Sequence, residues 1–84
     1  MDGNPVVTWK QYGRVRSKLA DLMDAKGLTR NAVAQMVHTR FEVIDRLYSD
    51  QSERVDLDIL ARICFVLDCD VKDLLEYDKA GAGR

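Results

Sequence analysis

The sequence predicts an all-α domain, a compact bundle of five short helices. Apolar residues recur at intervals of three and four from Tyr12 to Leu75, a spacing that places them on one face of a helix. Only residues 6–9, Val-Val-Thr-Trp, resemble a strand. The chain has 84 residues, the length of a single domain with a small core, so dimerisation would add to its stability.

The first helix is expected to run from Thr8 to Lys26 and to end at Gly27. Residues 8–11, Thr-Trp-Lys-Gln, fit a capping box and favour this early start. Gly13 interrupts the span, so the alternative is a start at Gly13 with residues 5–11 as an extended arm. The buried stripe of this helix contains Tyr12, Val15, Leu19, Leu22 and Met23.

Two short helices follow, separated by a connection of three residues. The first is expected at residues 29–37, with Thr29 as its N-cap. The second is expected at residues 40–48, where Thr39 and Glu42 match a capping box at its start. Two helices joined this tightly are typical of a helix-turn-helix, in which the second helix protrudes and can reach base edges in the major groove of DNA.

Two more helices complete the predicted bundle after a polar loop at residues 49–55. Asp56 is expected to cap a helix that ends near Leu67, and Asp70 a short helix that reaches about residue 77. Residues 78–84 are small and polar, which is typical of a flexible tail. The expected organisation is therefore an N-terminal arm at residues 1–7, the helical domain at residues 8–77, and this tail.

The fourth helix is apolar on nearly all sides. Six of its residues form the side expected to face the core: Leu57, Leu60, Ala61, Ile63, Cys64 and Leu67. Three more apolar residues lie outside that stripe: Ile59, Phe65 and Val66. Because a helix that is apolar all round is normally buried all round, we expect these three to form a homodimer interface. The alternative cover is the N-terminal segment with Val6, Val7 and Trp9.

Composition narrows the class of protein. The net charge is −1, but residues 1–40 carry +4 and the rest −5, a division that suits a basic face toward DNA and an acidic back. No apolar run is long enough to span a membrane, and no signal peptide is visible, so we expect a cytoplasmic protein. Cys64 and Cys69 are expected to be free thiols, and they lack the further ligands of a zinc site.

The helix-turn-helix segment resembles the phage-repressor type of DNA-binding domain, the Cro or Xre family, which has the lambda-repressor-like fold. The residues that carry the resemblance are Gly27-Leu28-Thr29, Val33-Ala34-Gln35, Val37, Thr39, Ile44 and Leu47. The apolar pattern of residues 57–75 is similar to the end of a small-regulator branch of that family, so the resemblance covers residues 12–77. His38 stands where the family usually has glycine, at a turn position that favours a positive φ.

The resemblance implies a DNA-binding role for seven residues: Arg30, Gln35, Thr39, Arg40, Phe41, Glu42 and Arg46. Arg30 matches a phosphate contact and Gln35 a commonly polar position of the second helix. Arg40, Phe41 and Glu42 match the exposed start of the recognition helix, where bases are read, and Arg46 matches a further base or phosphate contact.

The expected function is that of a sequence-specific transcription regulator bound to double-stranded DNA as a homodimer. The alternative is an antitoxin-like protein-interaction domain on the same fold, which the acidic second half and Asp45 favour. An enzyme is not expected, because the chain shows no nucleophile, base and orienting group in a recognisable set. No cofactor, metal or small-molecule substrate is implied.

Overall fold

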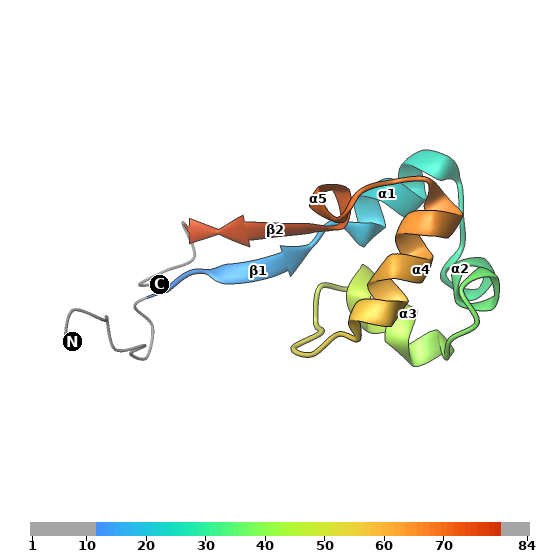
Figure 1. The fold of residues 1–84 in the computed structure, drawn as a ribbon, viewed down its shortest axis with the longest axis horizontal. Helices are drawn as coiled ribbons and strands as arrows, with labels where there is room; N and C mark the ends of the chain where they lie inside the picture. Colours follow the sequence, from blue (N-terminus) through green and yellow to red (C-terminus); the bar gives the residue numbers. More distant parts are fainter. Residues whose placement is uncertain (1–11, 80–84) are drawn as a thin grey trace.

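The computed structural model describes residues 12–79, which form five helices and two short strands (Figure 1). In chain order these are β1 (Arg14–Ser17), α1 (Leu19–Lys26), α2 (Arg30–Met36), α3 (Phe41–Tyr48), α4 (Leu57–Leu67), α5 (Val71–Leu74) and β2 (Leu75–Asp78). The helices form one bundle, and the two strands form a ribbon that projects from it. The expected capping box at residues 8–11, the arm at residues 1–7 and the last five residues lie outside the described part of the chain.

Every helix contributes to one apolar core. Its buried side chains are Leu19, Met23, Val33, Ala34, Val37, Ile44, Leu47, Ile59, Leu60, Ile63, Leu67 and Leu74. Among the described residues no polar or charged residue is buried. The three- and four-residue spacing of the apolar residues therefore predicted the bundle correctly, since burial of these stripes is the main favourable term in its folding.

The two ends of the domain form strands instead of helix, which corrects the all-α prediction. β1 and β2 pair antiparallel, with Val15 opposite Tyr77 and Arg16 opposite Glu76. Arg16 also forms an ion pair of 3.0 Å with Glu76. The first helix consequently begins at Leu19, later than either expected start, and the fifth helix ends at Leu74 instead of near residue 77.

Gly13 explains why a strand replaces the expected helix at the start of the domain. A Cβ atom at Gly13 would collide with the backbone of Asp78, so the close approach of the two chain segments requires glycine there. Tyr12 and Val15, which we expected in a buried helical stripe, are exposed on the ribbon. Asp78, which we expected in the tail, is the last residue of β2.

The helix ends mostly follow the expected capping residues. Gly27 ends α1 with a left-handed φ of 68°. Thr29 Oγ1 accepts a hydrogen bond of 3.1 Å from the N–H of Ala32, and Asp56 caps α4 in the same way. Asp70 forms a complete capping box with Asp73 at the start of α5.

Thr39 is the exception among the caps. The N-cap of α3 is Arg40, whose side chain makes no capping hydrogen bond, and the predicted box between Thr39 and Glu42 is absent. The N–H of Thr39 donates to the carbonyl of Ala34 over 3.0 Å, so Thr39 belongs to the turn that closes α2. Glu42 is consequently not engaged in capping.

The orientation of α4 differs from the prediction. Its buried residues are Ile59, Leu60, Ile63 and Leu67, so Ile59 belongs to the core and not to an exposed interface. Leu57 and Ala61, which we expected in the core, are exposed. A helix that is apolar nearly all round offers several equivalent faces to a core, so its sequence does not determine which one is buried.

Candidate nucleic-acid interface

The turn between α2 and α3 contains a residue in the left-handed region. His38 has a φ of 57°, which confirms the expectation drawn from its place in the turn. His38 donates its N–H to the carbonyl of Gln35, and the preceding Val37 is buried in the core. This conformation lets the chain reverse its direction within three residues. It is strained in any residue that has a Cβ atom, and glycine would avoid that strain.

Arg62 of α4 holds the same turn from outside the helix-turn-helix. Its Nη1 donates to the carbonyl oxygens of Val37 and His38, each over 3.2 Å. The Nη2 atom of Arg62 forms an ion pair of 2.7 Å with Asp58, one helical turn earlier. The guanidinium therefore satisfies two carbonyl groups that the end of α2 leaves without helical partners. Sequence analysis missed this role because the contact joins residues 24 positions apart.

Arg30 is the first residue of α2, and its side chain extends to α3. Its Nη1 atom donates to Oδ1 of Asp45 over 2.7 Å. Its guanidinium also lies over the rings of Phe41 and Tyr48, at 5.7 and 5.2 Å from their centroids. Both contacts are with α3, so Arg30 fixes the recognition helix against the start of α2 by charge and by cation–π attraction.

Tyr48 links this arrangement to α1. Its hydroxyl donates to Oδ1 of Asp24 over 2.9 Å, and this hydrogen bond to the Asp24 carboxylate raises the pKa of Tyr48. The carboxylate of Asp24 on α1 and that of Asp45 on α3 are thus both bound where α3 meets the preceding helices. Within α3 itself, the ion pair with Arg30 offsets the negative charge of Asp45.

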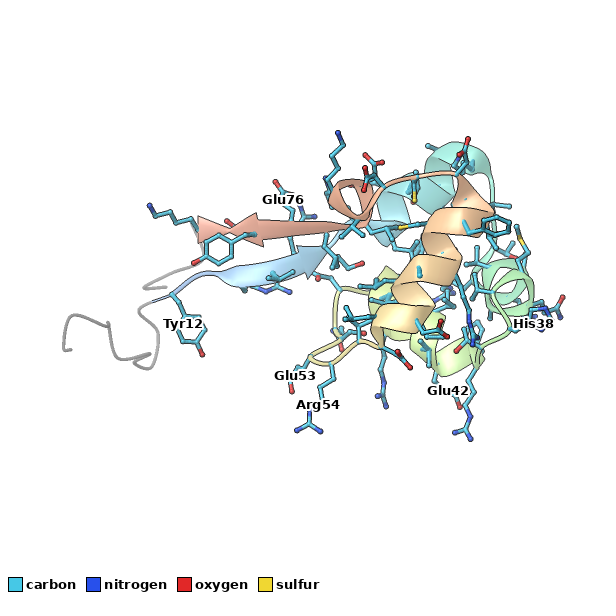
Figure 2. All side chains as sticks on the ribbon, viewed as in Figure 1. Tyr12, His38, Glu42, Glu53, Arg54 and Glu76 are labelled. Atoms are coloured by element: carbon cyan, nitrogen blue, oxygen red, sulfur yellow. The ribbon has the colours of Figure 1, made fainter. Side chains whose placement is uncertain are left out.

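The remaining candidate residues of α3 and of the turn are open to solvent. Gln35, Arg40, Glu42 and Arg46 are exposed, whereas Thr39 is half-buried. Phe41 is 42% exposed and lies beneath Arg30, so it is partly packed rather than free. Within residues 12–79 the guanidinium groups of Arg40 and Arg46 form no ion pair, unlike that of Arg30. Figure 2 shows Glu42 and Arg54 on the same side of the molecule.

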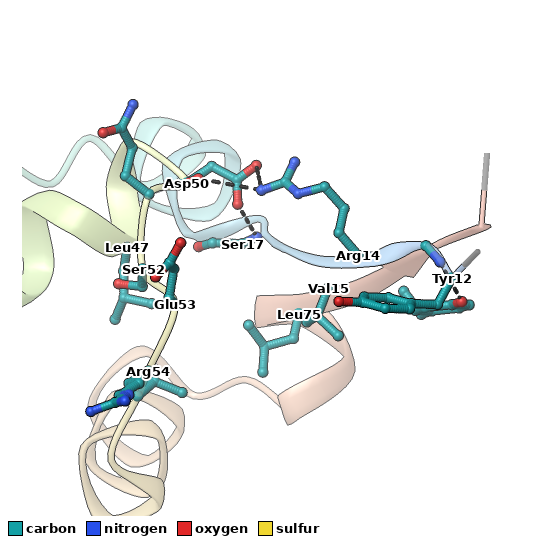
Figure 3. Close-up of a pocket in the computed structure, with 14 residues that line it drawn as sticks. Tyr12, Arg14, Val15, Ser17, Leu47, Asp50, Ser52, Glu53, Arg54 and Leu75 are labelled. Atoms are coloured by element: carbon teal, nitrogen blue, oxygen red, sulfur yellow. Dashed lines mark hydrogen bonds and ion pairs between the residues drawn. The ribbon is translucent and has the colours of Figure 1, made fainter. Parts of the chain in front are cut away.

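Asp50, at the end of α3, is bound to the ribbon. Its Oδ1 accepts the N–H of Ser17 over 2.7 Å and its Oδ2 pairs with Arg14 over 2.9 Å (Figure 3). Partial burial acts to raise the pKa of Asp50, but the hydrogen bonds from Ser17 and Arg14 together lower it below its usual value. The negative charge of Asp50 is consequently balanced inside the molecule.

Beside this contact, a groove runs between the ribbon and the loop that joins α3 to α4. Val15, Leu75 and Tyr77 line it from the ribbon, and Val55 lines it from the loop. Figure 3 shows Glu53 and Arg54 on the loop side. None of the described residues that line this groove is a histidine or a cysteine.

Cys64 and Cys69 are free thiols, as expected. Burial, with a smaller contribution from the neighbouring Cys64, raises the pKa of Cys69 to about 11. The thiolate form of Cys69 is therefore scarce at neutral pH, and with it the reactive form of the side chain. Residues 12–79 contain no group of three histidine, cysteine or acidic side chains placed to bind a metal ion. None of the helices in that span is long and apolar enough to cross a membrane.

Comparison with known proteins agrees with this geometry. Residues 18–80 match the family model of the Cro/C1-type helix-turn-helix DNA-binding domain. Among solved structures, that of the transcriptional regulator VanUg superposes with a TM-score of 0.70 at 25% sequence identity, over 90% of this chain and 97% of that one. A search of the curated proteins gave no significant match. The family match covers most of the sequence, so this chain belongs to the Cro/C1-type helix-turn-helix DNA-binding domain family.

Proposed function

We propose that the protein is a cytoplasmic, sequence-specific transcription regulator that inserts α3 into the major groove of double-stranded DNA and binds a two-fold site as a homodimer. The observation that carries this proposal is the contrast between the arginines of the helix-turn-helix. Arg30 is engaged with Asp45, whereas Arg40 and Arg46 are exposed and have no partner on the described chain. Exposed arginines at the N-cap and in the last turn of α3 suit phosphates and the O6 and N7 atoms of guanine.

In this proposal the exposed start of α3 reads bases. Arg40 and Arg46 contact guanine edges, and Glu42 accepts a hydrogen bond from the N4 amino group of cytosine. The absence of a capping box supports the role of Glu42, because its carboxylate is not committed to Thr39. Phe41, partly packed, offers its exposed edge to a thymine methyl group.

The phosphate contacts come from α2 and from the turn. Gln35 and Thr39 approach the backbone of one strand with their polar groups. Arg30 keeps its pair with Asp45 and uses its remaining N–H groups for a phosphate, since a guanidinium has five N–H donors and Nη1 supplies the bond to Asp45. Arg30 thereby also offsets the charge of Asp45, which would otherwise repel the DNA backbone.

Selection from a pool of random duplexes tests the proposal. We expect enrichment of a two-fold symmetric sequence, and loss of that preference in Arg40→Ala and Arg46→Ala. Lys72→Ala is the matched control, because Lys72 is an exposed base on α5, outside the helix-turn-helix. Failure to enrich any sequence at low salt would contradict DNA recognition and favour the alternative of an antitoxin-like protein-interaction domain, for which the acids of the second half of the chain are the supporting observation.

A further inference from the structure

An apolar stripe on α4 has no cover within the described chain. Leu57, Ala61 and Phe65 are four residues apart and therefore lie in one row along the helix. Phe65 is 87% exposed and Leu57 is 78% exposed. Beside Phe65 the surface is hollowed between α4 and the end of α2, where Met36 and Val66 form part of the lining. Exposed apolar surface of this kind, with a large aromatic side chain next to a hollow, is typical of protein–protein contact sites.

We infer that α4 of one copy packs antiparallel against α4 of a second copy, with the two-fold axis close to Ala61. This inference rests on the homodimer of the proposed function and specifies its surface. A helix rises about 1.5 Å per residue, so an antiparallel pair centred at Ala61 sets Leu57 level with Phe65 of the partner subunit. The small side chain of Ala61 allows close approach of the two helices at the centre, and each Leu57 lies level with the hollow beside the partner's Phe65.

The charges that flank the stripe are self-complementary in this arrangement. Asp58 and Arg62 lie on the same flank of α4, one turn apart, and already form an ion pair of 2.7 Å. A two-fold axis normal to the helices keeps that flank on the same side of both copies. Asp58 of one copy is then level, within about 3 Å along the axis, with Arg62 of the partner subunit. In a parallel arrangement the two-fold axis would run along the helices and carry this flank to the opposite side of the partner, so Asp58 and the partner's Arg62 would not meet.

The contact is reciprocal, so it closes into a dimer and does not extend into a filament. It also touches the DNA-binding unit. Arg62, at the edge of the stripe, holds the carbonyl groups of Val37 and His38 in the turn before α3. Formation of the dimer therefore orders a guanidinium that fixes the recognition helix.

The chain's own N-terminal segment is a poorer candidate for this site than a second copy. The described chain begins at Tyr12, at the far end of the ribbon, whereas His38 and the hollow lie at the opposite end of the molecule (Figure 2). The apolar residues of that segment, Val6, Val7 and Trp9, are three to six residues from Tyr12. They can extend at most about 20 Å from it.

Sedimentation equilibrium of the full chain without DNA tests the inference. We expect a dimer at micromolar concentration, and Phe65→Asp should raise its dissociation constant about thirtyfold, the effect of removing an aromatic side chain from the centre of an interface. Asp58→Lys should weaken association more than Asp58→Asn, because the lysine would face the partner's Arg62. Val71→Asp is the matched control: it places the same charge at an exposed apolar side chain on α5, outside the stripe.

Each result separates this inference from the proposed function. Phe65 and Val71 are exposed, so both variants should keep the circular dichroism spectrum and melting temperature of the parent protein. A dimer that Phe65→Asp dissociates, in a protein that selects no DNA sequence, supports the surface and contradicts the DNA-reading function. A monomer that still binds a single half-site contradicts the surface and supports DNA reading. A dimer that Phe65→Asp leaves intact contradicts the surface and does not bear on DNA reading.

Discussion

Arg30 at the start of α2 and Asp45 in α3 form a 2.7 Å ion pair that joins the two helices of the DNA-binding unit. The pair is about half exposed, with side-chain exposures of 45% and 40%, and two aromatic rings of α3 lie beneath its guanidinium. An exposed ion pair contributes about 0–1 kcal/mol to stability, so its main consequence is for charge and position. It places one cation and one anion of equal strength where the phosphate backbone would approach.

Removing the negative charge of Asp45 should strengthen the binding of the protein to duplexes of every sequence. In Asp45→Asn the guanidinium of Arg30 is free for phosphate, so affinity for an unselected duplex should rise and the slope of log K against log salt should steepen by about 1. Fluorescence anisotropy across a salt series measures both quantities. Asp73→Asn is a control with the same change of net charge, on α5 away from α3. Equal slopes for parent and Asp45→Asn would show that Asp45 does not limit the interaction of Arg30 with phosphate.

The two arginines that we propose to read bases, Arg40 and Arg46, should behave differently from Arg30. Arg40→Ala or Arg46→Ala should weaken binding to the selected site by about 1–3 kcal/mol and relax the preference at one base pair. Arg30→Ala should instead weaken all duplexes alike. Competition between selected and scrambled duplexes distinguishes the two patterns, and a uniform loss in Arg40→Ala would reassign that side chain to the backbone.

The strained turn gives a prediction about stability. Because His38 has a φ of 57°, His38→Gly should leave the free energy of unfolding unchanged or raise it by about 1 kcal/mol. His38→Val should lower it by about 1 kcal/mol or more, since a β-branched side chain is poorly accommodated there. Ala32→Gly, inside α2, is the opposite control and should cost about 1 kcal/mol. Urea unfolding measures all three, and a loss in His38→Gly as large as in Ala32→Gly would refute strain at the turn.

The contribution of Asp50 to the stability of the folded protein, through its contacts with the ribbon, should depend on pH. The pKa of Asp50 is lowered in the folded protein, so its contribution is present above the unfolded value of 3.8 and is lost as pH falls through the lower folded value. Asp50→Asn should therefore be less stable than the parent at pH 7, and the two should converge once the pH has fallen below the lowered pKa of the folded protein. Asparagine tolerates the left-handed φ of 59° at this position, so the change tests charge and not backbone. Thermal unfolding from pH 2 to pH 7 provides the comparison, and a constant difference across that range would exclude the ion pair as its cause.

Gly13 allows a direct test of the ribbon. Gly13→Ala should loosen the pairing of β1 with β2, because the added Cβ would meet the backbone of Asp78, which cannot move aside as a flexible side chain could. Gly27→Ala has open space around its Cβ and differs only in its φ of 68°, so it should cost about 1 kcal/mol. Amide hydrogen exchange shows which segment each variant loosens. Protection of the backbone amides should fall in β1 and β2 for Gly13→Ala, and at the end of α1 for Gly27→Ala. Unchanged exchange in both strands of Gly13→Ala would contradict the close approach.

Local signals in the sequence were enough to predict the helical body and the helix-turn-helix. Thr29, Asp56 and Asp70 act on backbone groups within three residues of themselves, and Gly27 needs only its own φ, so their roles are legible in the order of residues. The positive φ of His38 was expected from the resemblance, because the family usually has glycine at this turn position. Thr39 was mispredicted because its N–H had a competing acceptor in Ala34.

Contacts between distant residues were decided only by the tertiary structure. Residues 14–17 became a strand because the segment after Leu74 lies beside them, 60 positions further along the chain, and no local pattern encodes that pairing. Ile59 entered the core and Phe65 remained outside because α4 is apolar on several sides, and packing against the other helices chose between them. Arg30 and Arg62 show the same limit for the site. Sequence analysis assigned Arg30 the role of a phosphate contact and assigned Arg62 no role, and only the positions of Asp45, Val37 and His38 determined what each one holds.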